Sequence, residues 1–118
     1  MSYALWFDDV AKKQLEKLSR NLAIQGIITK MLHRIKTHGK AAGKIIEPQI
    51  GLYEVKSKHP PLRLYYQAEG RIMHIFAIRM KHSQKDQQRT INSIISKIRG
   101  LQVYNAFFGY FYGILPSA

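Results

Sequence analysis

The segment that decides the fold reads GLYEVKSKHPPLRLYYQ over residues 51–67 and RIMHIFAIRMKH over residues 71–82. Its apolar and aromatic runs, separated by turn-forming residues, predict three consecutive strands, at 50–56, 62–67 and 72–80. The third run is nearly all apolar, which is typical of a strand covered on both faces. Because the second and third runs are joined by a turn of hairpin length, we expect the three strands to pair as a meander.

Helical patterns flank this segment on both sides. Upstream, an apolar strand at 3–7 precedes a helix capped by Asp8 or Asp9, and a second apolar stripe at helical spacing runs over 24–35. Residues 19–21 either separate two helices or lie inside one bent hairpin. Downstream, Ser83 begins a spacing typical of a capping box, and a helix is expected from there to a stop at Gly100.

These elements predict the α+β class in the order β-α-α-β-β-β-α. The simplest way to bury their apolar faces is a small, mostly antiparallel sheet packed against an N-terminal helical hairpin. With 118 residues the chain is one domain, expected at 1–100, followed by an uncharged tail at 101–118 that is rich in aromatic residues. The tail is expected to fold over the sheet or pair with a neighbouring chain, with partner docking or a membrane surface as the alternative. It is too short and too glycine-interrupted for a membrane span of about 20 residues.

The charge balance points to a polyanionic partner. The formal net charge is +12, and the chain contains no cysteine, which excludes disulfides and cysteine-based zinc sites. The N-terminus has no basic stretch followed by an apolar one, so no signal peptide is expected and a cytoplasmic location is predicted. No integral membrane insertion is expected.

Several kinds of chemistry lack the residues that they require. The seven acidic residues are scattered, the five histidines lack metal-ligand spacing, and phosphate-binding glycine loops are absent. No metal or other cofactor is therefore predicted. Metal-free cleavage of RNA remains, in which cations stabilise a phosphorane while a base and an acid move protons. The candidate catalytic residues are basic ones within the segment 56–82: Lys56, Lys58, Arg63, Arg79, Lys81 and His82.

The side-chain chemistry suggests a division of roles within this set. Arginine grips two phosphate oxygens and stays protonated, so Arg63 and Arg79 suit charge stabilisation. His82 is the best candidate for proton transfer, because the reference pKa of histidine lies close to neutral pH. Either Lys56 or Lys58 could act as base only if neighbouring cations or desolvation lowered its pKa. Further RNA-binding candidates are Tyr65, Arg71, Lys85 and Arg89.

Two stretches of the sequence resemble the RelE/ParE superfamily of bacterial toxins, and most of all its HigB-like, phage-derived branch. The resemblance rests on the order of three short elements: Gly51-Leu52-Tyr53-Glu54-Val55, Arg63-Leu64-Tyr65-Tyr66 and Lys81-His82-Ser83-Gln84-Lys85. It runs through about residues 3 to 99. The branch usually has two lysines where this chain has Lys81-His82, and a position that is often apolar or aromatic is Arg79 here.

The resemblance implies a compact toxin fold and a type II toxin–antitoxin module with a cognate antitoxin as partner. It also implies cleavage of mRNA on the ribosome without metal, by the basic residues of the middle strands and the start of the last helix. Two alternatives remain at this point: a ParE-like inhibitor of DNA gyrase, and a non-catalytic module of the same fold that binds nucleic acid or a partner.

Overall fold

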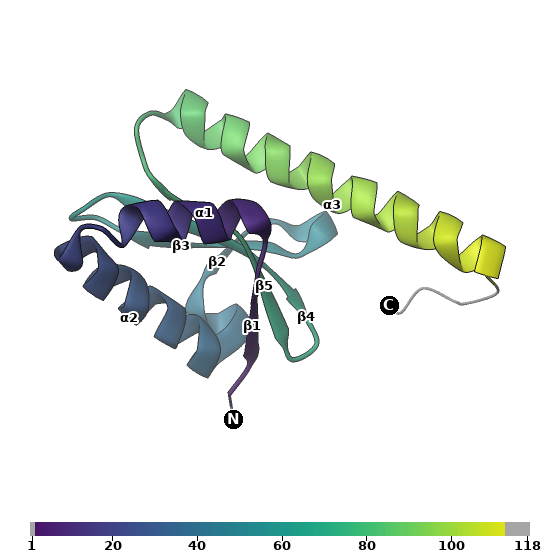
Figure 1. The fold of residues 1–118 in the computed structure, drawn as a ribbon, viewed down its shortest axis with the longest axis horizontal. Helices are drawn as coiled ribbons and strands as arrows, with labels where there is room; N and C mark the ends of the chain where they lie inside the picture. The colour runs from purple at the N-terminus through teal and green to yellow at the C-terminus, as the bar shows by residue number, and fades with distance from the viewer. Residues whose placement is uncertain (1, 113–118) are drawn as a thin grey trace.

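The computed structural model describes residues 2–112, with side chains described as far as Gln102. Short 3₁₀ turns at Gly39–Ala42 and Pro48–Ile50 lie on either side of the second strand. The predicted α+β class is confirmed, and the two N-terminal helices are separate (Figure 1). In chain order the helices and strands are β1 (Ala4–Phe7), α1 (Asp9–Leu18), α2 (Leu22–His38), β2 (Lys44–Glu47), β3 (Leu52–Ser57), β4 (Leu62–Glu69), β5 (Ile72–Met80) and α3 (Gln84–Tyr112).

The strands form one mixed sheet in the order β1-β5-β4-β3-β2. The three predicted meander strands pair antiparallel, and β1 pairs with β5 in parallel after the chain has crossed over through both helices. The edge strand β2 was not predicted. It has only four residues, and its pairing with β3 shifts register between Ile45 and Glu47, so its sequence carries little strand periodicity.

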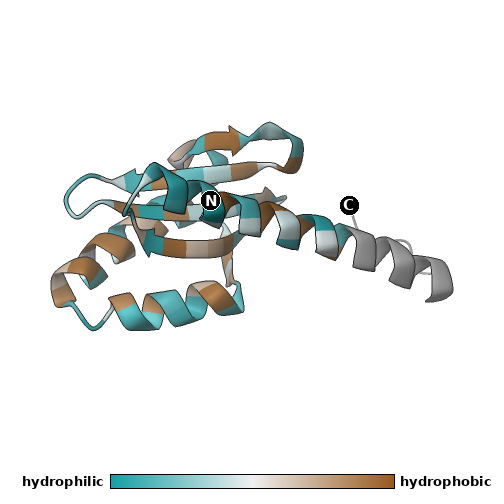
Figure 2. Cartoon of the chain, turned by 90° about the horizontal axis from the view of Figure 1, so that it is seen from above, coloured by the Kyte–Doolittle hydropathy of each residue, from teal (hydrophilic) through white to brown (hydrophobic). Residues whose placement is uncertain are grey.

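The hairpin of α1 and α2 covers one face of the sheet. Each helix begins where a side chain caps it: Asp8 accepts a hydrogen bond from the amide of Val10 (3.2 Å), and Asn21 accepts one from the amide of Ala23 (3.0 Å). The helices carry alternating hydrophilic and hydrophobic bands (Figure 2), as surface helices do. The hydrophobic side of each helix packs against the sheet. The resulting core includes Ala11, Ile28, Met31, Ile35, Val55, Leu62, Leu64, Tyr66, Met73, Ile75 and Ile78.

A β-bulge in β5 explains why this strand is apolar almost throughout. The register of β5 against β4 shifts between Tyr65 and Tyr66, so Phe76 and Ala77 both lie on the face opposite the hairpin. Their neighbours Ile75 and Ile78 pack into the hairpin core. The strand is therefore covered on both faces, as predicted. On this second face α3 completes a smaller cluster of Ile50, Leu52, Tyr65, Phe76, Ala77, Ile94 and Ile98.

The last helix is longer than its sequence suggested. Its start is as expected, because the Ser83 hydroxyl accepts a hydrogen bond from the amide of Asp86 (3.1 Å). The predicted stop at Gly100 was wrong, since α3 continues to Tyr112. A Cβ at Gly100 would meet nothing within 4 Å, and one glycine costs a helix only about 1 kcal/mol. The role predicted for the aromatic side chains of the tail lies outside the described side chains.

Candidate active site

Strand pairing aligns three of the predicted cations in one row. Lys56 on β3 lies opposite Arg63 on β4, which in turn lies opposite Arg79 on β5. Directly opposite residues of paired strands project to the same face of a sheet. The three side chains therefore share the face that α3 partly covers, while the catalytic role assigned to them stays a prediction.

At one end of this row lies a small hollow beneath the first turns of α3. Its interior is about 10 Å³, which is room for no more than one water molecule. The loop from β5 into α3 contributes Lys81 and His82, so four of the predicted catalytic residues meet here. The residues around the hollow are Arg63, Tyr65, Arg79, Met80, Lys81, His82, Asp86, Gln87 and Thr90.

Arg63 is held in place by backbone carbonyls at the end of β3 and the start of β4. One terminal nitrogen of its guanidinium donates to the carbonyl of Leu62 (3.0 Å) and to that of Ser57 (3.3 Å). Its Nε is buried and has no hydrogen-bond partner among the described residues. A buried charged donor without an acceptor is costly, so this nitrogen suits an anionic oxygen from a ligand.

Arg79 is connected to the last helix. Its guanidinium donates to the hydroxyl of Thr90 (2.7 Å), and that hydroxyl donates to the carbonyl of Asp86 one turn earlier (3.1 Å). Because both helix residues also line the hollow, the position of Arg79 depends on where α3 lies.

Tyr65 is a buried part of the site instead of a surface for stacking. Its side chain is only 1% exposed, and its hydroxyl hydrogen-bonds with Glu54 and Gln87, whose side chains also bond to each other (2.8 Å). Burial, with the nearby Glu54 carboxylate, raises the pKa of Tyr65 to about 12. Tyr65 was predicted to bind RNA, and its buried ring presents no surface on which a base could stack.

The other predicted residues lie at the edges of the site or away from it. Lys58 follows the end of β3 and is exposed, as are Lys85 and Arg89 on the first turns of α3. The Arg89 guanidinium lies 3.7 Å from the Asp86 carboxylate. Arg71 lies in the turn between β4 and β5, at the far end of both strands from the hollow, and its role in RNA binding stays a prediction.

Sequence reasoning missed the polar residues that α3 supplies. Gln87 and Thr90 both reach the sheet, to Glu54 and Arg79 respectively. A signal was present, since these two residues are three apart and share one side of the helix with Ile94 and Ile98. Between residues 2 and 112, no group of three or more acidic, histidine or cysteine side chains is placed to bind a metal ion. Nor is any helix in that range long and apolar enough to cross a membrane.

No protein-family model matches the chain, and no curated protein matches it in sequence. Solved structures do match. A variant of the E. coli toxin RelE in the free state, with two arginines changed to alanine, superposes with a TM-score of 0.63 at 21% identity. The match covers 80% of this chain and 99% of that one. The chain has the RelE fold.

Two toxin–antitoxin complexes give the same result. The intact E. coli RelBE complex matches with a TM-score of 0.56 at 20% identity, over 70% of this chain and 100% of that one. The RelBE2 complex of Mycobacterium tuberculosis matches with a TM-score of 0.55 at 16% identity, over 69% of this chain and 100% of that one. Likeness at this identity establishes the RelE fold and leaves activity to be argued from the site.

Proposed function

We propose that this chain is the toxin of a type II toxin–antitoxin module and a metal-independent endoribonuclease that cuts mRNA on translating ribosomes. The proposal rests chiefly on the row of Lys56, Arg63 and Arg79, which ends beside Lys81 and His82. The RelE fold supports the proposal, because solved structures with this fold include RelE in complex with its antitoxin or with a peptide of that antitoxin. The elements Gly51–Val55 and Arg63–Tyr66 favour the narrower placement in the HigB-like branch, although Lys81-His82 departs from the two lysines that are usual there.

The proposed reaction uses side chains that line the hollow together with a lysine of the neighbouring strand β3. A base takes the proton from a ribose 2′-OH, and the oxygen attacks the neighbouring phosphorus. Arg63 and Arg79 stabilise the negative charge that accumulates on the phosphorane oxygens. The bond from phosphorus to the 5′-oxygen breaks, an acid protonates that oxygen, and a 2′,3′-cyclic phosphate remains. His82, exposed beside the hollow, is assigned to one of the two proton transfers, and a lysine of β3 is the candidate for the other.

The unpartnered Nε of Arg63 favours a bound phosphate over a bare surface. Because this nitrogen is buried, a phosphate oxygen could accept its hydrogen bond only after the first turn of α3 shifts, and the guanidinium would then contact the group whose charge changes during the reaction. The hollow itself holds no more than a water molecule, so the scissile phosphate must lie at its mouth. A shift of the first turn of α3 would admit it further.

The proposed partner that restrains the toxin is a cognate antitoxin with an acidic segment. The net charge of +12 would make association with such a segment fast and sensitive to salt. RelE of E. coli has been solved in complex with a peptide of its antitoxin RelB, which supports a protein partner of this kind. We expect the segment to cover the basic row or to displace α3. The proposed site of action is the cytoplasm, where ribosomes translate.

The test is inducible expression of the wild-type chain beside the Lys81→Ala/His82→Ala variant, with growth and mRNA 5′ ends as readouts. A matched control is Lys30→Ala/His33→Ala, which removes the same residue types from exposed positions of α2. Growth arrest with new, codon-phased 5′ ends is expected for the wild type and the control, and neither is expected for the first variant. Arrest with intact mRNA and a DNA-damage response would replace the proposal with gyrase inhibition. No arrest by the wild type would leave a non-catalytic binding module.

A further inference from the structure

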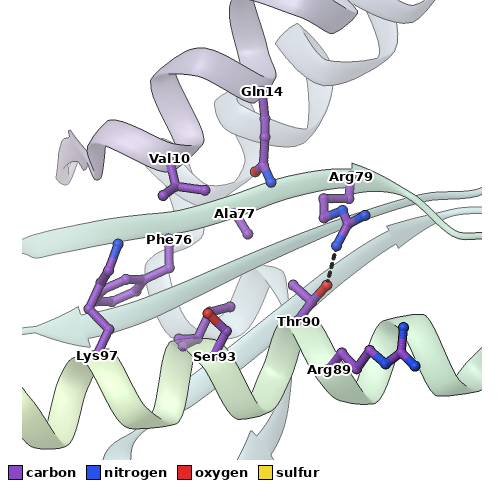
Figure 3. Close-up of a pocket in the computed structure, with 10 residues that line it drawn as sticks. Val10, Gln14, Phe76, Ala77, Arg79, Arg89, Thr90, Ser93 and Lys97 are labelled. Carbon is purple, nitrogen blue, oxygen red and sulfur yellow. Dashed lines mark hydrogen bonds between the residues drawn. The ribbon is translucent and has the colours of Figure 1, made fainter.

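A groove between α1, β5 and α3 is not used by the proposed chemistry. Its first compartment has a volume of about 190 Å³ and opens between α1 and α3, with β5 as its floor (Figure 3). The floor is apolar and includes the ring of Phe76, while hydroxyl groups of Thr90 and Ser93 line the α3 side. The full lining is Val10, Gln14, Phe76, Ala77, Arg79, Arg89, Thr90, Ser93, Ile94 and Lys97.

The groove continues towards the candidate active site. A second compartment of about 360 Å³ shares Gln14 and Arg79 with the first and ends at His82. Its lining adds Lys17 and Leu18 from α1, and Ile78 and Met80 from β5. Arg79 lines both compartments and the hollow described above, so one arginine lies at the junction of all three.

Charge and size both suit a strand of nucleic acid. Cations from three elements line the two compartments: Lys17, Arg79, Arg89 and Lys97. Neither compartment has an acidic residue among its described lining. The 190 Å³ part is smaller than the roughly 300–1,000 Å³ of sites that enclose a whole small molecule. It is therefore suited to one portion of a longer ligand, with an apolar floor for a base and cations for the phosphates on either side.

Two of the groove cations already pair with acidic residues outside the lining, and the two pairs differ in strength. Lys97 forms a 2.7 Å ion pair with Asp8, which joins α3 to the start of α1 and keeps the groove walls together. The Arg89 side chain is 70% exposed, and its contact with Asp86 is long at 3.7 Å. An exposed ion pair of that length contributes little, so a phosphate can take its place.

We propose that this groove binds the single-stranded nucleotides that flank the scissile phosphate in the RNA substrate. The inference rests on the proposed function and extends it by a binding subsite on the side of Arg79 away from the Lys56–Arg63 row. RNA is favoured over an acidic protein segment because the groove joins the hollow through Arg79 and Thr90. A strand whose phosphate lies at the hollow has to leave along one of these walls.

Binding of a strand that cannot be cut isolates this subsite from catalysis. The probe is a 2′-O-methyl oligoribonucleotide of about ten nucleotides, a length in the range of single-strand site sizes, with affinity measured by fluorescence anisotropy at several salt concentrations. The variants Lys17→Gln and Arg89→Gln remove groove cations. The matched controls Lys13→Gln and Arg99→Gln remove the same charges from exposed positions of α1 and α3 that line neither compartment.

Each groove variant is expected to weaken binding roughly five- to tenfold and to lower the slope of log affinity against log salt by about 0.7, the value for one single-strand phosphate contact. The controls should stay within about twofold, which is the effect of general charge alone. A steric pair gives a second readout: Ser93→Trp fills the groove and should weaken binding, whereas Ser96→Trp, exposed on the same helix, should not. Thermal unfolding of all six variants checks that the fold is kept.

Equal losses in the groove variants and their controls would overturn the subsite, as would the absence of salt-sensitive binding by the wild type. A poly-glutamate peptide is the competing probe. If Lys17→Gln and Arg89→Gln weaken its binding and leave RNA binding unchanged, the groove belongs to an acidic protein partner and the inference is wrong. If the wild type binds RNA with the expected pattern but cuts no mRNA in cells, the nuclease proposal fails and the subsite stands. If the wild type cuts mRNA in phase with codons but each groove variant binds RNA as tightly as its matched control, the subsite is wrong and the nuclease proposal stands.

Discussion

The two faces of the sheet are covered by different kinds of contact. On one face, α1 and α2 join the strands through an apolar core that includes Leu64 and Ile75, both fully buried. On the other face, a smaller apolar cluster shares the interface with three polar contacts that tie α3 to the rest of the fold. These contacts run from Gln87 to Glu54, from Arg79 to Thr90 and from Lys97 to Asp8.

This difference separates stability from chemistry. Burial of apolar side chains provides most of the favourable free energy of folding, and the hairpin face has the larger share of it. The α3 face buries fewer apolar side chains and instead has a row of cations, a hollow and a groove. Charged groups of this kind are useful only where a ligand can reach them, so the face proposed to bind RNA is expected to be the less well-packed one.

The largest expected effect comes from a matched pair of truncations, one on each face. Ile75→Ala should lower the free energy of unfolding by about 2–5 kcal/mol, because Ile75 is fully buried in the hairpin core. Ile94→Ala should cost less, since Ile94 is 5% exposed and already borders the groove. Urea unfolding of both variants measures the difference. A larger loss for Ile94→Ala would show that the α3 face is the main source of stability.

The second prediction concerns the cation row. Arg63→Ala and Arg79→Ala should each lower the rate of mRNA cleavage by more than tenfold, which corresponds to at least about 1.4 kcal/mol of transition-state stabilisation. Both proteins should stay folded, because neither arginine belongs to an apolar cluster. Arg99→Ala, at an exposed position on α3, is the control. Wild-type toxicity in both row variants would remove the active-site assignment.

The smallest effect, visible only in alkali, compares the adjacent tyrosines that face opposite ways. Burial raises the pKa of Tyr65 and of Tyr66 to about 12, above the value of 10.0 that each has when unfolded. Between pH 10 and pH 12 the unfolded chain loses these protons and the folded chain keeps them. The free energy of unfolding must therefore fall as the pH rises through this window.

Phenylalanine substitutions show how much of the fall in unfolding free energy at alkaline pH comes from the tyrosine on each face of the sheet. Tyr65→Phe and Tyr66→Phe should each flatten the fall in unfolding free energy between pH 10 and pH 12, measured by urea unfolding at a series of pH values. Tyr53→Phe is the control, because Tyr53 is only partly buried. A slope that neither buried variant changes would place the alkaline sensitivity elsewhere in the fold.

Much of the architecture could be predicted because it is written in local patterns. The apolar run of β5, the cap at Asp8 and the turn at Gly70 each depend on residues that are close in sequence. The limits of α3 and the edge strand β2 could not. A glycine stops a helix only where the surroundings favour another conformation, and a four-residue strand forms only where a partner strand lies beside it.

The sequence by itself determined the net charge, the order of the main elements and the kinds of side chain available for chemistry. Only the tertiary structure decided which of them meet. Strand register placed Arg63 between Lys56 and Arg79, and a bulge turned Phe76 and Ala77 towards α3. The same pairing left Arg71 at the far end of its strands and buried Tyr65 beneath the last helix. The physical reason is that strand periodicity is local, whereas register and the docking of α3 depend on contacts between residues far apart in the chain.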